Sequence, residues 1–472
     1  MEKFNGVVFL AVYSVMFIVP LANNGGIGRA IATGTPDGSE IWGYVQVRPK
    51  ANMFWWYYKS PYRIENSSKP WPIILWLQGG PGASGVAVGN FQEVGPIDDS
   101  LNPRNSTWLR QADLLFVDNP VGTGYSYVED KSLLVKTDVE AAADLTALLI
   151  EVFNNRIVKL QKSPLFIVAE SYGGKFAVTL GLSALEAIEK GKLKLKLGGI
   201  ALGDSWMSPE DYVHSWGPLL YDVSRLDENG LKRSNSLARE IKNKIDGAEF
   251  TNATKLWAEL EDVIDDNTDG VDIYNFLLDY NSDDALESTT LYTQSHKLAM
   301  KRYSTYLQSL TKKNKPLANG SAGPIDLFTL MNETIREKLR IIPKNFTWGE
   351  QEGSVFENMV GDFMRPRVEE VDELLAKGVN MTIYNGQLDV ICSTKGTESW
   401  IRKLKWKGLK TFLRKERTPI YCGRSGGTKA FTKSYQNLHF YWIIGAGHFV
   451  PVDQPCVSLD MIHRITQSPA LL

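Results

Sequence analysis

A serine flanked by small residues is the position where this chain is best equipped for nucleophilic chemistry. Ser171 lies in the sequence Ala-Glu-Ser-Tyr-Gly-Gly at 169–174, between an apolar run at 165–168 and a helix-compatible segment at 175–187. A strand, a sharp turn and a helix in this order are typical of a nucleophile elbow, which raises the serine hydroxyl above the sheet edge. Ala169 stands where the usual motif has glycine, so an ordinary strand–helix turn remains the alternative for this motif taken alone.

A serine nucleophile needs a histidine that takes its proton, and three histidines follow Ser171 late in the chain. His448 comes directly after a predicted aromatic strand at 438–444, in a loop of small residues, and is therefore the expected base. His439 opens that strand and is predicted to pack within it. His463 belongs to the C-terminal amphipathic segment and is predicted to lie on a surface helix.

The histidine in turn needs an acid that fixes its tautomer and stabilises its charged form. Asp389 lies in the loop 385–389, after a predicted strand at 379–384, and is the expected acid. Asp453 is the rival, but its position shortly after His448 favours a role as the cap of the last helix.

Backbone N–H groups must also face the oxyanion that forms when serine attacks a carbonyl. The residue after the nucleophile, Tyr172, offers one such group. A second donor is expected from the glycine-rich loop 78–82, which follows the predicted buried strand 73–77, although an ordinary turn would have the same composition.

Five sequence blocks together resemble the serine carboxypeptidase family, in the order in which that family has them. The resemblance spans nearly the whole chain after its N-terminal segment. The blocks are WLQGGPG at 76–82, EVGP at 93–96, DNPVGTGYS at 118–126, ESYGG at 170–174 and GAGHFVP at 445–451. Two further segments, LGDSW at 202–206 and NTDGV at 267–271, resemble the retinoid-inducible branch of that family.

The resemblance implies an α/β-hydrolase fold with a mostly helical inserted cap, and it implies roles for individual residues. Ser171, Asp389 and His448 would form the catalytic triad, and Gly80 and Tyr172 would supply the oxyanion N–H groups.

The resemblance also implies a site for the C-terminal carboxylate of a peptide. Glu93 and Glu170 would share one proton there, and Gln78 and the Gly79 N–H would complete the contact. Two close carboxyls do not readily ionise together, so one of them would meet the anionic substrate as a donor. Without the resemblance, Glu93 would be interpreted as a solvated loop acid and Glu170 as a surface acid at a strand end.

The chain departs from the family pattern at two positions. Gln78 replaces the usual asparagine, which moves the amide one methylene further out. Ala83 replaces a cysteine that usually forms a disulfide after Gly-Pro-Gly, and a less rigid loop is expected.

The expected organisation is a signal peptide at 1–22, a hydrolase core at 23–206 and 366–472, and an inserted cap at 207–365. The segment between Asp204 and Val379 is charged and helix-compatible, without obvious buried strands. Residues 265–270 match the first half of a calcium loop, but Phe276 stands at the position that requires a bidentate glutamate. We therefore predict a helix–loop–helix turn there, no metal site in the chain and no cofactor.

Composition limits the function further. A net charge of −2 predicts no general affinity for nucleic acid or anionic membranes. The basic run 402–407 alternates with apolar residues and is predicted to present a solvated face beside a half-buried one. Three cysteines cannot provide a disulfide framework. Cys422 and Cys456 could pair, and Cys392 lies close to Asp389 in sequence.

The N-terminal 22 residues combine Lys3 with an apolar run and predict a secretory signal, with a retained membrane anchor as the alternative. Secretion or delivery to a lysosome would make N-x-S/T sequons available for glycosylation. Seven are present, of which Asn380 is expected to be too enclosed: Asn66, Asn105, Asn252, Asn319, Asn332, Asn345 and Asn380.

The sequence thus predicts an enzyme that releases C-terminal amino acids from peptides or proteins through an acyl-enzyme, and that favours acid pH. Two alternatives remain at this point: an esterase or acyltransferase on the same scaffold, and a non-catalytic secreted binding protein. The sequence gives no prediction of oligomeric state.

Overall fold

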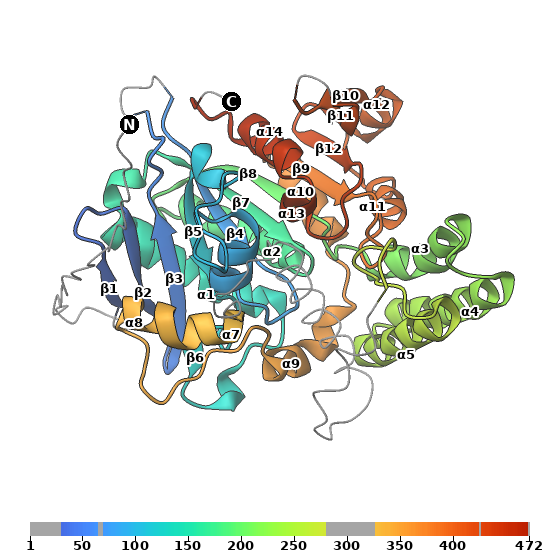
Figure 1. Cartoon of the computed structure of the whole chain (residues 1–472), viewed down its shortest axis with the longest axis horizontal. Helices are drawn as coiled ribbons and strands as arrows, with labels where there is room; N and C mark the ends of the chain where they lie inside the picture. The colour runs from blue at the N-terminus through green and yellow to red at the C-terminus, as the bar shows by residue number, and fades with distance from the viewer. Residues whose placement is uncertain (1–29, 65–68, 280–325, 424–425, 471–472) are drawn as a thin grey trace, which may run out of the picture.

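A computed structural model describes residues 30–64, 69–279, 326–423 and 426–470 (Figure 1). A single mixed sheet runs through this part of the chain in the order β1-β2-β3-β5-β4-β7-β8-β9-β12-β11-β10, with β6 paired to β3. Its strands are β1 (Ala30–Gly34), β2 (Glu40–Arg48), β3 (Ala51–Tyr58), β4 (Ile73–Leu77), β5 (Asp113–Val117), β6 (Tyr127–Val128), β7 (Pro164–Glu170), β8 (Lys196–Gly203), β9 (Met381–Gly386), β10 (Thr418–Tyr421), β11 (Thr428–Tyr435) and β12 (Leu438–Ile443).

The centre of the sheet is parallel and its two margins are antiparallel. All pairs from β5 through β4, β7, β8 and β9 to β12 are parallel, whereas the hairpins β1-β2-β3 and β12-β11-β10 flank them. Every residue of β4 and β5 is buried, as expected for parallel strands covered on both faces. Because parallel strands end at the same edge, the loops after β4, β7, β8, β9 and β12 are brought together there.

Two groups of helices pack on this sheet. Helix α1 (Asp138–Glu151) contacts α2 (Gly173–Glu189), which also contacts α10 (Val368–Ala376) and β7. Helix α14 (Pro455–Thr466) contacts β8, and α13 (Val450–Asp453) contacts the π-helix η1 (Gly85–Val94). A capping box at Thr137 and Glu140 fixes the start of α1.

The chain between β8 and β9 is helical in its described residues, as its composition predicted. Helices α3 (Pro209–Asp222), α4 (Glu228–Asp246) and α5 (Phe250–Thr268) form a group beside the sheet, seen in green at the right of Figure 1. The short helices α7 (Leu327–Leu330) and α8 (Arg336–Leu339), then α9 (Gly353–Phe363), lead back to the core. Helix α11 (Thr394–Ile401), which packs on α3, and α12 (Leu409–Arg414) follow β9.

Three local expectations need correction or can now be settled. The strand expected at 379–384 begins at Met381 and extends to Gly386, because β9 continues its pairing with β12 through that residue. The acidic segment 265–270 ends α5, and Asp269 takes a left-handed conformation. Residues 271–279 form turns and isolated bridges, and a second helix of the expected helix–loop–helix turn does not begin within them. Cys422 and Cys456 form a disulfide, and Cys392 is free and buried.

The close pairing of β8 and β9 leaves no room for a side chain at Gly203. A Cβ there would lie 2.1 Å from the Tyr384 ring. We expect Gly203→Ala to lower the free energy of unfolding by about 1–3 kcal/mol, because overpacking forces neighbouring groups to move. Gly427→Ala is the control, since a Cβ at Gly427 meets nothing within 4 Å. Equal unfolding midpoints in denaturant for the two variants would contradict this reading.

Candidate active site

Ser171 lies in a strained turn between β7 and α2. It has a φ of 59°, in the left-handed region that non-glycine residues rarely adopt, and its N–H donates to the Gly203 carbonyl at 3.1 Å. Two neighbouring glycines are required by the crowding: a Cβ at Gly79 would lie 2.6 Å from that of Ser171, and one at Gly173 would lie 2.3 Å from the Leu77 carbonyl oxygen. The turn therefore has the geometry expected of a nucleophile elbow.

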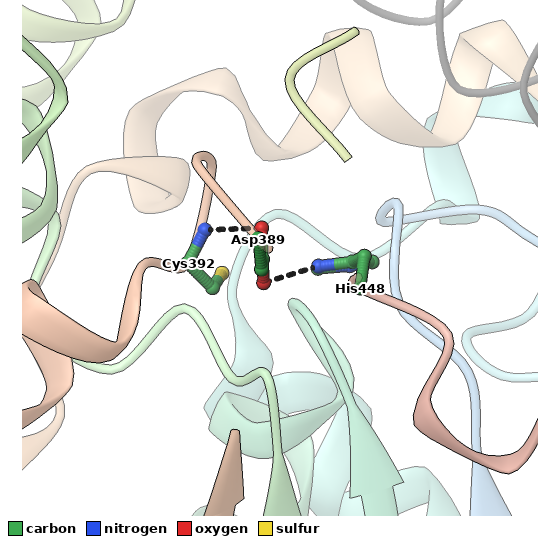
Figure 2. Close-up of side chains that lie close together, drawn as sticks. All are labelled: Asp389, Cys392 and His448. Atoms are coloured by element: carbon green, nitrogen blue, oxygen red, sulfur yellow. Dashed lines mark hydrogen bonds and ion pairs between the residues drawn. The ribbon is translucent and has the colours of Figure 1, made fainter. Parts of the chain in front are cut away.

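The structure places the expected acid and base in direct contact. Asp389, in the loop after β9, accepts a hydrogen bond at Oδ2 from His448 Nδ1 at 2.8 Å, and at Oδ1 from the Cys392 N–H at 3.1 Å (Figure 2). Both Asp389 and His448 are fully buried. The carboxylate holds the imidazole in the tautomer that leaves Nε2 free to accept a proton.

The Nε2 atom of His448 is buried and has no hydrogen-bond partner among the described residues. No hydrogen bond joins it to Ser171 Oγ, although Ser171 follows β7 at the same edge of the sheet. Hydrogen bonds between catalytic groups are often long in the free enzyme and shorten when substrate binds. The backbone N–H of His448 donates to the Tyr274 carbonyl at 2.9 Å, and the His448 ring packs against the Tyr274 ring at 5.1 Å between centroids.

The rival residues have other partners. His439 lies within β12, as predicted, and pairs with Ser434 Oγ at 2.9 Å. His463 is on a helix, but it is half-buried and contacts Gln111 Oε1 at 3.0 Å.

The prediction that Asp453 caps the last helix is wrong. Helix α14 starts after Gln454, without a side-chain cap. Asp453 instead accepts a hydrogen bond from the Gly447 N–H at 2.7 Å, so it holds the loop that carries His448.

The glycine-rich loop after β4 lies against the serine turn. Gly80 has a φ of +104°, which favours glycine, and its N–H, like that of Tyr172, donates no hydrogen bond within the described residues. Gly80, Ser171 and Tyr172 line one cavity. Two N–H groups there are therefore available to an oxyanion.

Backbone pairing ties the loop at Ala83 to the segment before α9. Ala83 and Gln351 form an antiparallel bridge, the Ser84 N–H donates to the Glu350 carbonyl at 3.0 Å, and the Glu352 N–H donates to the Gly82 carbonyl at 2.9 Å. Asp118 adds a second constraint, because its carboxylate accepts from Ser84 Oγ at 2.6 Å.

Glu93 and Glu170 meet in the interior, on η1 and at the end of β7. Both side chains are buried and each acts strongly on the other, so they cannot readily ionise together and the pair favours a shared proton. Gln78 is the third member of the group. Its Oε1 accepts from Trp76 Nε1 at 2.6 Å and its Nε2 donates to Glu170 Oε1 at 3.0 Å, so the longer side chain still directs its amide at the pair.

Burial dominates the electrostatics of this pair. It raises the pKa of Glu93 to about 8, against the opposing effect of hydrogen bonds from Glu170 and Gln78. The pKa of Glu170 is raised well above its usual range by burial and then by the charge of Glu93. The pair therefore keeps at least one proton at neutral pH.

Aromatic side chains from the helical segments between β8 and β9 cover the serine. Phe363 on α9 stacks on Tyr172 at 5.8 Å between centroids, and it contacts Trp257 on α5 at 4.7 Å. Sequence reasoning identified neither these residues nor Tyr274 and Gln351, because nothing in a helical pattern shows which face lies over a distant site. The cavity is lined by Gly80, Ser171, Tyr172, Trp206, Trp257, Tyr274, Gln351, Phe356, Phe363 and Ile391.

The side chains of Asp389, Cys392 and His448 approach within 4.8 Å of one another, as Figure 2 shows. The two atoms that would be the best metal ligands, Asp389 Oδ2 and His448 Nδ1, are already joined by a hydrogen bond. Burial raises the pKa of the Cys392 thiol well above its usual range, which opposes the thiolate form that metals bind.

The sequons differ in exposure. Asn105, Asn252 and Asn345 are exposed, and Asn380 is exposed as well, so the expectation that it is enclosed is wrong. The Asn332 amide has a structural role, since its Nδ2 donates to the Phe328 and Trp348 carbonyls at 3.0 and 3.1 Å. Asn66 and Asn319 lie outside the described residues, as does the segment 1–22.

The basic run behaves as predicted: Leu404 and Trp406 are buried, and the charged residues around them, Arg402, Lys403, Lys405 and Lys407, are exposed. Within the described ranges, no helix has the length and apolar character needed to cross a bilayer.

The sheet order and the position of Ser171 after β7 define an α/β-hydrolase fold. A solved structure supports this: the protein resembles the prohormone-processing carboxypeptidase Kex1(Δ)p of Saccharomyces cerevisiae with a TM-score of 0.71, covering 93% of this chain and 92% of that one at 20% identity. The chain belongs to the serine carboxypeptidase family, whose model matches residues 31–468, and it is thus a serine-type hydrolase.

Two relatives match over almost their full lengths. The chain is 58% identical to serine carboxypeptidase-like 51 of Arabidopsis thaliana, over 98% of this chain and 99% of the relative. It is 44% identical to the human retinoid-inducible serine carboxypeptidase, over 96% and 97% respectively. The resemblance found from the sequence blocks is confirmed.

The protonated pair should make the protein more stable in acid. The folded pKa of Glu93 is raised from 4.5 to about 8, so between these values the folded state holds a proton that the unfolded state loses. Stability from this source is complete below about pH 4.5 and is lost as pH rises through about 8. We expect the Tm to fall by several degrees from acid to alkaline pH.

Calorimetry across this range tests the assignment. Glu93→Gln should flatten the dependence, because its amide cannot ionise, whereas the exposed-site control Glu129→Gln should not. A Tm that rises from acid to alkaline pH in the wild type would contradict a proton-sharing pair.

Proposed function

We propose that this protein is a carboxypeptidase that releases C-terminal amino acids from peptides or proteins, with Ser171, His448 and Asp389 as its catalytic triad. The observation that carries the proposal is the buried hydrogen bond from His448 to Asp389, which leaves His448 Nε2 without another partner. A buried imidazole oriented in this way is suited to take a proton from a serine hydroxyl.

The reaction proceeds through two displacements. Ser171 Oγ attacks the carbonyl carbon of the last peptide bond as its proton passes to His448 Nε2, and the resulting oxyanion accepts hydrogen bonds from the Gly80 and Tyr172 N–H groups. The C–N bond breaks and His448 returns the proton to the departing amino acid. Water, deprotonated by His448, then attacks the acyl-enzyme and releases the shortened peptide together with Ser171.

The Glu93–Glu170 pair is proposed to bind the free carboxylate of the substrate, together with Gln78 and the Gly79 N–H. A buried, proton-sharing pair donates to an anion, whereas two ionised carboxylates would repel it. Glu170 directly precedes Ser171 in the chain, which supports this role. The terminal carboxylate of a peptide is only one residue away from its last peptide bond, so the group that binds it must lie near the nucleophile.

We propose that residues 207–365 form the cap over this site. Phe363 contacts both Tyr172 and Trp257, which supports this, because these contacts bring aromatic groups to the cavity that Ser171 lines. They also surround the acyl group with an apolar, partly dry environment, in which oxyanion hydrogen bonds are stronger.

We also propose a secretory route, with removal of residues 1–22, glycosylation of exposed sequons and a secreted or lysosomal location. The Cys422–Cys456 disulfide supports an oxidising compartment. Among the sequons that the structure describes, Asn332 is the least suited to modification, because its amide hydrogens are already donated within the fold.

A panel of blocked dipeptides with free or amidated ends tests the function and the nucleophile. Free-acid peptides should be cleaved about 10²-fold or more faster than their amides, as expected when a charged group that the site binds is removed. Ser171→Ala should abolish both hydrolysis and labelling by a fluorophosphonate probe, and Thr179→Ala is a matched control in the helix that follows.

Equal rates on amides and free acids would favour the esterase or acyltransferase alternative. A wild type that neither hydrolyses any substrate of the panel nor reacts with the probe would favour a binding protein. Labelling that persists in Ser171→Ala would refute the nucleophile.

The pH dependence tests the carboxylate site. The pKa of Glu93, raised to about 8, implies that kcat/KM for free-acid peptides falls as pH rises through that value, by about tenfold per pH unit beyond it. The fall should be weaker for esters without a free carboxylate. A profile for free-acid peptides that does not decline between acid pH and about pH 8 or above would sink the proposal that acid conditions are favoured.

A further inference from the structure

A third buried acid adjoins the Asp389–His448 pair and has no part in the chemistry above. Asp204 follows β8 directly, is fully buried and has a φ of 39°, within the left-handed region. Its N–H donates to the Tyr384 carbonyl at 3.0 Å, which fixes its backbone against the end of β9. A buried carboxyl in a strained conformation is unusual unless its surroundings require it.

The two oxygens of Asp204 have different partners. Its Oδ1 accepts from the Gly386 N–H at 2.8 Å and from Asn385 Nδ2 at 3.0 Å. The Asn385 amide is itself fixed, because its Oδ1 accepts from Thr397 Oγ1 at 2.6 Å. The second oxygen, Oδ2, is buried and accepts no hydrogen bond from any donor of the described residues.

Asp389 is the charged group that acts most strongly on Asp204, and both side chains are fully buried. Two neighbouring carboxyls in the interior do not readily ionise together, so one of these two acids carries a proton. Each oxygen of Asp389 already accepts from an N–H group, Oδ1 from Cys392 and Oδ2 from His448. Asp204 Oδ2 has no donor of its own. The proton therefore belongs on Asp204 Oδ2, which then donates to a carboxylate oxygen of Asp389 and is no longer a buried atom without a partner.

The surroundings of Asp204 agree with this placement. It is faced by Asp389 from the loop after β9, by Glu170 at the end of β7, by the Tyr384 hydroxyl on β9 and by Asp453 on α13. Burial and then the charge of Asp389 raise the pKa of Asp204 well above its usual range. An ionised Asp204 would add a negative charge to a group of acids without gaining a donor.

We propose that Asp204 is a positioning residue: as a neutral acid it donates a hydrogen bond from Oδ2 to Asp389 and keeps that carboxylate directed at His448 Nδ1. The inference rests on the proposed triad. Asp204 follows β8, which lies in the sheet between β7, the strand before Ser171, and β9, the strand before Asp389. Positioning Asp389 would require a fixed carboxyl, which the hydrogen bonds to Asp204 Oδ1 provide. A neutral donor steadies Asp389 without adding charge beside His448.

Two variants separate donation from simple filling of space. Asp204→Asn keeps an acceptor for Gly386 and Asn385 and a donor toward Asp389, and both Asn and Gly tolerate the left-handed backbone. Asp204→Gly removes the donor without backbone strain. On an ester without a free carboxylate, we expect Asp204→Gly to lower kcat by about 10–100-fold with little change in KM. Asp204→Asn should keep kcat close to that of the wild type, within about threefold.

Two readouts report the proton itself. The infrared band of protonated carboxylic acids should lose intensity in Asp204→Asn relative to the wild type at neutral pH, whether or not the enzyme is active. The loss of ester activity that follows ionisation of Asp204 at alkaline pH should also be absent in Asp204→Asn, because an amide cannot ionise.

The proposal is overturned if Asp204→Asn is as slow as Asp204→Gly, if Asp204→Gly keeps the wild-type kcat, or if the infrared band is unchanged. Failure of the proposed function looks different. The wild type itself would then lack esterase activity and probe labelling, while the infrared difference would still report the proton on Asp204.

Discussion

Buried carboxyl groups at one edge of the sheet are the constraint to which the rest of the site must conform. Glu93, Glu170, Asp204 and Asp389 are all removed from water, and a low dielectric makes several neighbouring negative charges prohibitively unfavourable. Only Asp389 receives both a backbone N–H and an imidazole N–H. Burial raises the pKa of each of the other three carboxyls, so Glu93 and Glu170 share a proton and Asp204 holds one.

The backbone makes this arrangement possible. The parallel strands β7, β8 and β9 are hydrogen-bonded neighbours, so the residues that follow them emerge side by side. The turn at Ser171 can approach the loop after β4 only because Gly79 and Gly173 lack a Cβ. At Ala83, where no disulfide can form, backbone pairing with Gln351 ties this loop to the segment before α9.

The helical segments between β8 and β9 give the site its apolar side. Phe363 and Trp257 come from helices far apart in the sequence and contact each other. Phe363 also stacks on Tyr172, which is expected to supply an oxyanion donor. Lys175 holds the Tyr172 side chain in place. Its buried Nζ lies 3.2 Å from the Tyr172 hydroxyl and 3.5 Å from Asp362 Oδ2. The surface that a substrate would contact is therefore braced by an ion pair in the interior.

The sequence by itself determined the family, the strand–turn–helix at Ser171 and the candidates Asp389 and His448, because each depends on local composition and on chain order. It placed strands to within a few residues and missed where β9 ends, since that end is set by pairing with β12. Only the tertiary structure decided which buried atoms lack a donor. From the sequence, Asp453 was expected to cap a helix, but it accepts a hydrogen bond from the Gly447 N–H. The pairing of Ala83 with Gln351 and the contacts of Asp204 with the loop after β9 could not be read from the sequence, in which Asp204 was only one residue of the block at 202–206. Hydrogen-bond partners and burial are properties of chain segments that meet from distant parts of the sequence, so no local pattern contains them.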